Sequence, residues 1–138
     1  MTKPMPKVAE YMTENPHSIG RHEPLEEAYA RMRRHNVRHL PVLVGKRLVG
    51  IIADPDLRTV ELLKRVNLAE ITVEDAMTPV PYAVMVDTPL AEVAREMAAQ
   101  KYDAVVVMRD ADVAGVFTAV DALRALADLL GGSSKRSP

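Results

Sequence analysis

Apolar positions recur every three to four residues in two long segments of the chain. One segment is residues 25–35 ("LEEAYARMRRH") and the other is residues 90–100 ("LAEVAREMAAQ"). This spacing predicts one amphipathic helix in each segment. A proline precedes each segment, and proline suits the first position of a helix. We therefore expect the two helices to begin at Pro24 and Pro89.

Short apolar runs of strand length follow each predicted helix. They are "HLPVLV" and "LVGIIA" after the first helix, and "AVVVM" and "VAGVFT" after the second. The polar residues "GKR" and "RDAD" separate the runs, so each pair predicts a β-hairpin. A short strand ("HSIG", "YAVMV") precedes each long helix, and a closing helix ("DPDLRTVELLKRV", "AVDALRALADLL") ends each set. Asp54 followed by Pro55 predicts the N-cap and first turn of the first closing helix.

The two sets of elements are copies of each other. Sliding the chain by 65 residues aligns them without a gap and gives eleven identical pairs, including Gly50 with Gly115 and Asp56 with Asp121. An internal duplication is the best explanation. The predicted fold is α/β (α+β), with two β-α-β-β-α repeats. We place the repeats at residues 7–65 and 73–130, with a linker at 66–72 and a flexible polar tail at 131–138.

Three motifs resemble those of tandem CBS domains, the arrangement called a Bateman module. They are Met-Thr near the start of each copy, "HLPV" at residues 39–42, and Gly-h-h-x-x-x-Asp (h, apolar) at 50–56 and 115–121. The resemblance covers residues 7–130. It implies a stand-alone module whose repeats are related by a pseudo-two-fold axis, with a cleft at each end. It also implies paired modules and a regulatory, energy-sensing role through an adenosyl ligand: AMP, ADP, ATP, NAD(H) or S-adenosylmethionine.

Composition and charge exclude several other classes of protein. There is no cysteine, so there is neither a disulfide framework nor a thiolate metal site, and the four histidines are not at metal spacing. No segment is long enough for a membrane span, and we expect a cytoplasmic protein. Residues 1–65 carry 12 Lys and Arg against 8 Asp and Glu, whereas residues 66–138 carry 6 against 11. The net charge of −1 gives no reason to expect nucleic-acid binding, and no catalytic motif indicates an enzyme.

Asp121 is the main candidate for binding a ribose. A carboxylate at the start of a helix can accept hydrogen bonds from both ribose hydroxyls, and the free N–H groups there suit a phosphate. Thr118 adds a hydroxyl on the same rim. The alternative is that Thr118-x-x-Asp121 is only a capping box. In the first repeat the equivalent positions are Ala53 and Asp56.

The resemblance implies that each cleft also draws on the other repeat. Apolar members of this set would flank a purine, although ordinary core packing is an alternative for each of them. The residues expected at the Asp121 cleft are Met12, His17, Val37 and Arg38, and those at the Asp56 cleft are Met77, Val80, Tyr82 and Tyr102.

Arg38 and Asp103 occupy equivalent positions in the two repeats. Motif alignment assigns Arg38 differently from the cleft assignment above: it would hold a phosphate for the Asp56 cleft, whereas Asp103 would repel one at the Asp121 cleft. We therefore expect the Asp56 cleft to bind a phosphorylated ligand and the Asp121 cleft to tolerate a ligand with an uncharged or cationic tail. The alternatives for Arg38 are a solvated side chain or an ion pair with Asp103.

The sequence as a whole predicts a regulatory ligand-binding module that requires no cofactor and passes ligand binding to a protein target. The alternative is a structural dimerisation module without a ligand. A homodimer is expected because the closing helices carry more apolar residues than one face can bury. Those residues are Leu57, Val60, Leu62, Leu63, Leu123, Leu126, Leu129 and Leu130.

Overall fold

The computed structural model describes residues 5–55 and 57–131 and divides them into two compact units. Unit 1 joins the N-terminal segment up to Asn15 to the chain from Tyr82 onward, and unit 2 is Pro16–Pro81. The chain therefore leaves unit 1 after Asn15 and returns to it at Tyr82. Each repeat of the sequence gives its first residues to the unit that the other repeat builds.

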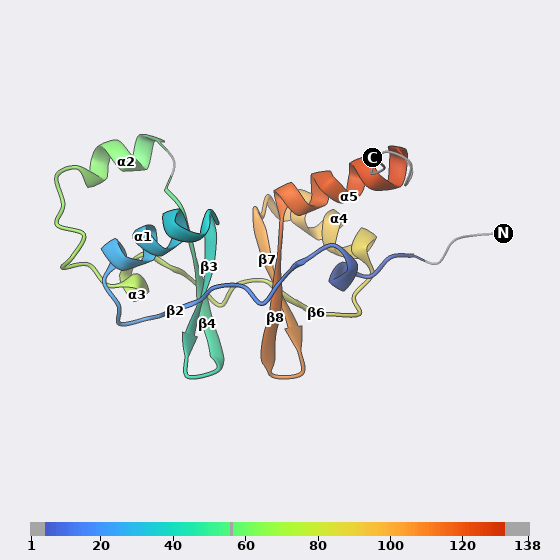
Figure 1. Ribbon diagram of the computed structural model, residues 1–138, viewed down its shortest axis with the longest axis horizontal. Helices are drawn as coiled ribbons and strands as arrows, with labels where there is room; N and C mark the ends of the chain where they lie inside the picture. Colours follow the sequence, from blue (N-terminus) through green and yellow to red (C-terminus); the bar gives the residue numbers. More distant parts are fainter. Residues whose placement is uncertain (1–4, 56, 132–138) are drawn as a thin grey trace. The chain divides into compact units, whose positions relative to one another are not determined.

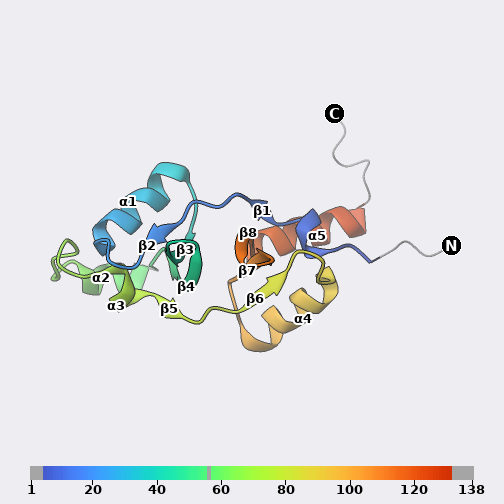
Figure 2. The ribbon, with the colours of Figure 1, turned by 90° about the horizontal axis from the view of Figure 1, so that it is seen from below.

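Unit 2 is a four-stranded sheet with helices packed against it (Figures 1 and 2). The strand order is β2-β3-β4-β5, in which β2 is parallel to β3 and the other pairs are antiparallel. Helix α1 packs on β3, and α3 packs on β4. The elements are β2 (Ile19–Gly20), α1 (Leu25–His35), β3 (His39–Val44), β4 (Arg47–Ala53), α2 (Leu57–Leu63), α3 (Val73–Ala76) and β5 (Thr78–Pro79).

Unit 1 repeats this architecture. Its strand order is β1-β8-β7-β6, with β6 parallel to β7 and the other pairs antiparallel. Figure 2 shows β1 running beside β8. The elements are the 3-10 helix η1 (Val8–Glu10), β1 (Thr13–Glu14), β6 (Ala83–Met85), α4 (Leu90–Gln100), β7 (Ala104–Arg109), β8 (Asp112–Thr118) and α5 (Ala119–Gly131). The predicted α+β class and its two repeats are thus confirmed.

The motif glycines make room for the exchanged Met-Thr segments. In unit 1, Thr13 pairs with Val116 of β8, and a Cβ on Gly115 would lie 2.6 Å from the sulfur of Met12. Gly50 faces Met77 in the same way in unit 2. In each unit, the motif glycine of one repeat therefore contacts the Met-Thr motif of the other repeat. Any larger side chain at the glycine would collide with that Met-Thr segment.

The duplication extends to the finest features of the backbone. The residues with positive φ form three pairs at an offset of 65, namely Asn15 with Val80, Asn36 with Lys101, and Gly45 with Asp110. Both hairpins also have their register irregularity at the same place, after Val42 and after Val107. Val80 is the unusual member, because a β-branched residue with φ of 48° is strained.

The core of each unit is mostly aliphatic, as the shortage of aromatic residues requires. Unit 2 buries residues such as Leu25, Met32 and Leu40, and unit 1 packs Val93 and Val105 around the single phenylalanine of the chain, Phe117.

Three predicted helix starts need correction. Pro24 and Pro89 are the N-cap residues, because their ψ angles of 146° and 135° are extended, and the helices begin one residue later. The first closing helix begins at Leu57, so Asp54 and Pro55 precede it and are not its N-cap and first residue.

The division into units also changes the charge balance, because the acidic residues of 66–81 join unit 2, whereas residues 1–15 carry no net charge. Unit 2 carries ten Lys and Arg against nine Asp and Glu, and unit 1 carries eight against ten. The strong asymmetry between the halves of the sequence is therefore largely lost. None of the helices in the described ranges is both long and apolar enough to cross a membrane.

Candidate functional site

The start of α5 holds the buried carboxylate of Asp121. Thr118 donates to its Oδ2 from the backbone N–H at 3.0 Å and from the hydroxyl at 3.1 Å, and the Asp121 N–H donates back to the Thr118 hydroxyl at 3.2 Å. The predicted capping box is thus formed, with aspartate in the third helical position. Asp121 is 3 % exposed and is the one buried charged residue in the described part of the chain.

The other repeat contributes a hydroxyl to this carboxylate. The Thr13 side chain lies 3.5 Å from Oδ1 and 3.4 Å from Oδ2 of Asp121, at the outer limit of hydrogen bonding. Met12 precedes it and packs against Gly115. Arg124, one turn further along α5, donates to Oδ1 at 2.8 Å. One unit therefore gathers the acid and both threonine hydroxyls in one place.

Asp103 and Arg38 hold equivalent backbone positions in their own units. The carbonyl of Asp103 accepts a hydrogen bond from the Ala119 N–H at 2.9 Å, next to the capping box. The carbonyl of Arg38 accepts one from the Asp54 N–H at 2.8 Å in unit 2. Both side chains belong to exposed residues. Asp103 therefore sits beside the start of α5, as the motif alignment places it.

Asp56, the second ribose candidate, lies outside the described residues. Of the residues expected with it, Met77 packs against Gly50. Val80 is 89 % exposed, so the alternative reading of Val80 as a core residue is wrong. Its exposed apolar side chain and its positive φ occur together, and such strain clusters at functional sites.

Tyr82 and Tyr102 form an aromatic pair in unit 1. Their ring centroids are 5.3 Å apart, with 26° between the ring planes. Burial raises the pKa of Tyr82, and the carboxylates of Glu96 and Glu92 raise it further. The pair offers a flat apolar surface of the kind on which a planar base stacks.

His17 lies in unit 2 and stacks on His35 at the end of α1. The centroids are 3.5 Å apart and the rings are within 10° of parallel. Desolvation lowers the pKa of His35, and the nearby His17, Arg34 and Arg31 lower it further. His17 is therefore held by α1, and Val37 packs against the core of the same unit.

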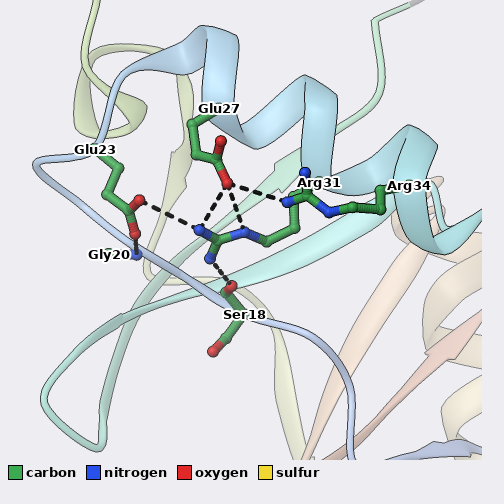
Figure 3. Close-up of polar contacts among 6 residues, drawn as sticks. All are labelled: Ser18, Gly20, Glu23, Glu27, Arg31 and Arg34. Atoms are coloured by element: carbon green, nitrogen blue, oxygen red, sulfur yellow. Dashed lines mark hydrogen bonds and ion pairs between the residues drawn. The ribbon is translucent and has the colours of Figure 1, made fainter.

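A charged clamp on α1 fixes the segment that follows His17 (Figure 3). Arg31 donates to the Ser18 carbonyl at 2.8 Å, to Glu27 at 2.8 and 3.1 Å, and to Glu23 at 3.3 Å. Glu23 also accepts from the Gly20 N–H at 3.2 Å. The hydrogen bonds from Arg31 lower the pKa of Glu27. Arg31 and Arg34 of α1 are thus part of an ion-pair network with Glu23 and Glu27.

The residues expected around the two clefts fall into different units. Unit 1 holds Met12, Tyr82, Tyr102, Thr118 and Asp121, and unit 2 holds His17, Val37, Arg38, Met77 and Val80. The sequence analysis expected the segment from Met12 at the Asp121 cleft, but it did not identify Thr13 or Arg124 as direct partners of Asp121. Arg124 had a signal, because residues three apart on a helix face each other. For Thr13, the only signal in the sequence was its place in the repeated Met-Thr motif.

Comparison with known proteins assigns the chain to a family. The family model described as "CBS domain" matches residues 8–62 and again residues 73–128. Inosine-5′-monophosphate dehydrogenase of Korarchaeum cryptofilum is 29 % identical over 122 residues. Those residues cover 88 % of this chain and 24 % of the enzyme, so the chain spans about a quarter of the length of that relative.

Solved structures with the same fold cover nearly the whole chain. AcuB of Vibrio cholerae, named for acetoin utilization, has a TM-score of 0.79 at 25 % identity and covers 98 % of this chain and 100 % of its own. CBSX2 in complex with AMP has a TM-score of 0.74 at 26 % identity, with 90 % and 98 % covered. The CBS domain pair of MJ0100, in complex with 5′-methylthioadenosine and S-adenosyl-L-methionine, has a TM-score of 0.77 at 26 % identity, with 90 % and 98 % covered. With two in-register matches and a shared fold, this chain belongs to the CBS-domain family and carries two CBS domains in tandem.

Proposed function

We propose that this chain is a regulatory module that binds an adenosyl ligand and passes the binding on as a conformational change. The observation that carries the proposal is the start of α5, where the Asp121 carboxylate, the Thr118 hydroxyl and the Thr13 hydroxyl meet at a helix N-terminus. Two relatives with this fold bind AMP, or 5′-methylthioadenosine and S-adenosyl-L-methionine. Adenine joined to a ribose with free 2′ and 3′ hydroxyls is the part that these ligands share.

The ribose is the group that we assign to Asp121. A charged carboxylate can accept hydrogen bonds from both hydroxyls of the sugar, and each such bond contributes about 1.5–3 kcal/mol. In unit 1 we assign the purine to apolar and aromatic side chains, Tyr82 and Tyr102 among them. For the equivalent site of unit 2 we assign a phosphate to Arg38. The exposed Asp103 carboxylate disfavours a phosphate beside α5, so we expect an uncharged or cationic tail there.

We propose a regulatory and not an enzymatic role. The dehydrogenase relative matches over about a quarter of its length, and its activity is not carried over to this chain. A bound ligand shifts a conformational equilibrium by its difference in affinity for the two states. A protein target that distinguishes those states would then read the ligand.

Asp121→Asn tests the ribose assignment. We expect wild-type protein to be stabilised by about 2.7 kcal/mol at an adenosine concentration of 100 times Kd. The asparagine side chain keeps the shape of aspartate but loses its charge. Adenosine affinity, measured by calorimetry, should therefore fall about tenfold or more, since one charge-assisted bond is worth about 1.5–3 kcal/mol.

A second capping box provides the matched control. Thr72 and Asp75 form the same reciprocal pair at the start of α3, with hydrogen bonds of 3.3 Å in each direction. Asp75→Asn should lower the melting temperature and leave adenosine affinity unchanged. If Asp121→Asn behaves like Asp75→Asn, then Asp121 is only a cap and the chain is better described as a structural dimerisation module.

We also propose that the protein is a homodimer associated through its closing helices. Helix α5 buries Asp121 and Ala125 but exposes large apolar side chains along its length. Helix α2 exposes Leu62 to 70 %. Exposed apolar patches of this kind are typical of protein interfaces. The exposed residues of α5 are Val120, Leu123, Leu126, Leu129 and Leu130.

A further inference from the structure

The two oxygens of the Asp121 carboxylate have different partners. Oδ2 accepts two hydrogen bonds from Thr118, one from its backbone N–H and one from its hydroxyl. Oδ1 accepts a charged hydrogen bond from Arg124 at 2.8 Å. The Asp121 side chain is 4 % exposed as a result. A ribose that approaches this carboxylate finds both oxygens engaged.

Of these partners, Arg124 is the one that can leave without unfolding the unit. Thr118 is the N-cap of α5, and its contacts hold the start of the helix. The Arg124 side chain is 66 % exposed and forms an ion pair within its own helix, so it can rotate into water without moving the backbone. Thr13 is held only weakly, at 3.4 and 3.5 Å.

We propose that Arg124 is a latch that closes Oδ1 of Asp121 in the unliganded protein and that a ligand must displace it to reach the carboxylate. This inference rests on the proposed ribose site. The latch lowers the affinity for every adenosyl ligand by the free energy of one ion pair. It makes Arg124 a positioning residue that controls access to Asp121.

The latch belongs to one repeat. The position equivalent to Arg124, 65 residues earlier, is Thr59, which carries no charge. In sequence, the two repeats therefore differ at this position as well as at Arg38 and Asp103.

Calorimetry with adenosine tests the latch, because adenosine is uncharged and cannot form an ion pair with Arg124. The ion pair joins an exposed guanidinium to a buried carboxylate, so its loss should tighten adenosine binding by Arg124→Gln at least about two- to fivefold, the range that corresponds to a fully exposed pair. Salt screens an exposed guanidinium. Wild-type affinity for adenosine should therefore rise between low and high sodium chloride, and the affinity of Arg124→Gln should not.

Arg95→Gln is the matched control. Arg95 is an exposed arginine of α4, and among the described residues it has no ion-pair partner. Its replacement removes one positive charge from the same unit and should change neither the affinity nor its salt dependence.

Three other results are decisive. Equal adenosine affinity in wild type and Arg124→Gln at all salt concentrations would overturn the latch. Weaker adenosine binding by Arg124→Gln would also overturn it, because Arg124 would then be a ligand contact. If Asp121→Asn still lowers the affinity in either case, the ribose site stands and the latch alone fails. If Asp121→Asn has no effect on adenosine binding, the proposed site itself is wrong.

Discussion

Single residues in this chain serve two demands at once, and Asp121 is the clearest case. As a capping residue it fills the third helical position of α5 and satisfies the Thr118 N–H. As a buried carboxylate it needs charged or hydroxyl donors, since an uncompensated buried charge is costly. Thr118, Arg124 and Thr13 supply those donors. In the proposed site, the same donors control the access of a ligand to the carboxylate.

Titration of His35 should make stability depend on pH. Desolvation and the neighbouring positive groups lower the pKa of His35 in the folded protein, so the unfolded chain binds a proton more readily. The stabilisation is fully present above the unfolded pKa, near 6.5, and is lost as pH falls through the lower folded pKa. Melting temperatures measured between neutral and mildly acidic pH should therefore fall less steeply for His35→Gln than for wild type.

Gln100 stands at the position equivalent to His35, so the substitution uses a residue that the fold already accepts there. His22→Gln, which changes an exposed histidine outside the stack, is the control and should follow the wild-type curve. Parallel curves for wild type and His35→Gln would contradict the assignment.

At the scale of elements, α1 and α4 occupy equivalent positions in the two repeats but carry different charges. Glu27 and Arg31 of α1 correspond to Glu92 and Glu96 of α4. The turn before each helix is anchored alike, with the Gly20 N–H on Glu23 and the Met85 N–H on Thr88, both at 3.2 Å. Only α1 has the arginine that completes the clamp. In the described part of the chain, Glu92 and Glu96 have no ion-pair partner.

Glu96→Arg should therefore give α4 an ion pair with Glu92 that is equivalent to the Glu27–Arg31 pair of α1. The change removes a like-charge pair at i,i+4 and adds an attractive one, each worth about 0.2–0.5 kcal/mol. The melting temperature should rise by a few degrees, since about 1 kcal/mol moves it by roughly 4 °C in a domain of this size.

Glu96→Gln separates the two effects, because it removes the repulsion without adding a guanidinium. Its melting temperature should lie between those of wild type and Glu96→Arg. No difference between the two variants would mean that the new guanidinium does not pair with Glu92.

At the scale of the whole molecule, the closing helices are the unusual feature. A surface helix normally turns its leucines toward the core. Helix α5 instead exposes Leu123 to 64 % and Leu126 to 52 %, while it buries Ala125. Burying a leucine side chain contributes about 1.5–3 kcal/mol, so several such residues can hold two chains together.

Leu123→Glu combined with Leu126→Glu should dissociate the dimer. Sedimentation should then show a particle of 15.2 kDa in place of one with about twice that mass. The isolated chain should lose little stability, because exposed positions away from special features tolerate substitution within about 0.5 kcal/mol. Ala98→Glu adds a carboxylate to an exposed position of α4 and should leave the dimer intact. A wild-type protein that sediments as a monomer would remove the proposed interface.

The sequence by itself determined the elements, their order and the duplication. Apolar periodicity reports which side of a segment is buried, and the ungapped offset of 65 residues carries that pattern, and the family motifs, from one repeat to the other. The hairpins and long helices therefore lie where the pattern predicts them, with errors at the prolines that cap α1 and α4.

Only the tertiary structure decided which segments meet. Periodicity shows that a face is buried but not what buries it, and the pairing of β1 with β8 joins residues about a hundred positions apart. That pairing moves the N-terminal segment into unit 1 and brings Thr13 to Asp121. The inclusion of residues 66–81 in unit 2 removes most of the charge asymmetry. The occupation of Oδ1 by Arg124 depends on a side-chain rotamer, which the sequence leaves open because an exposed arginine has many conformations of similar energy.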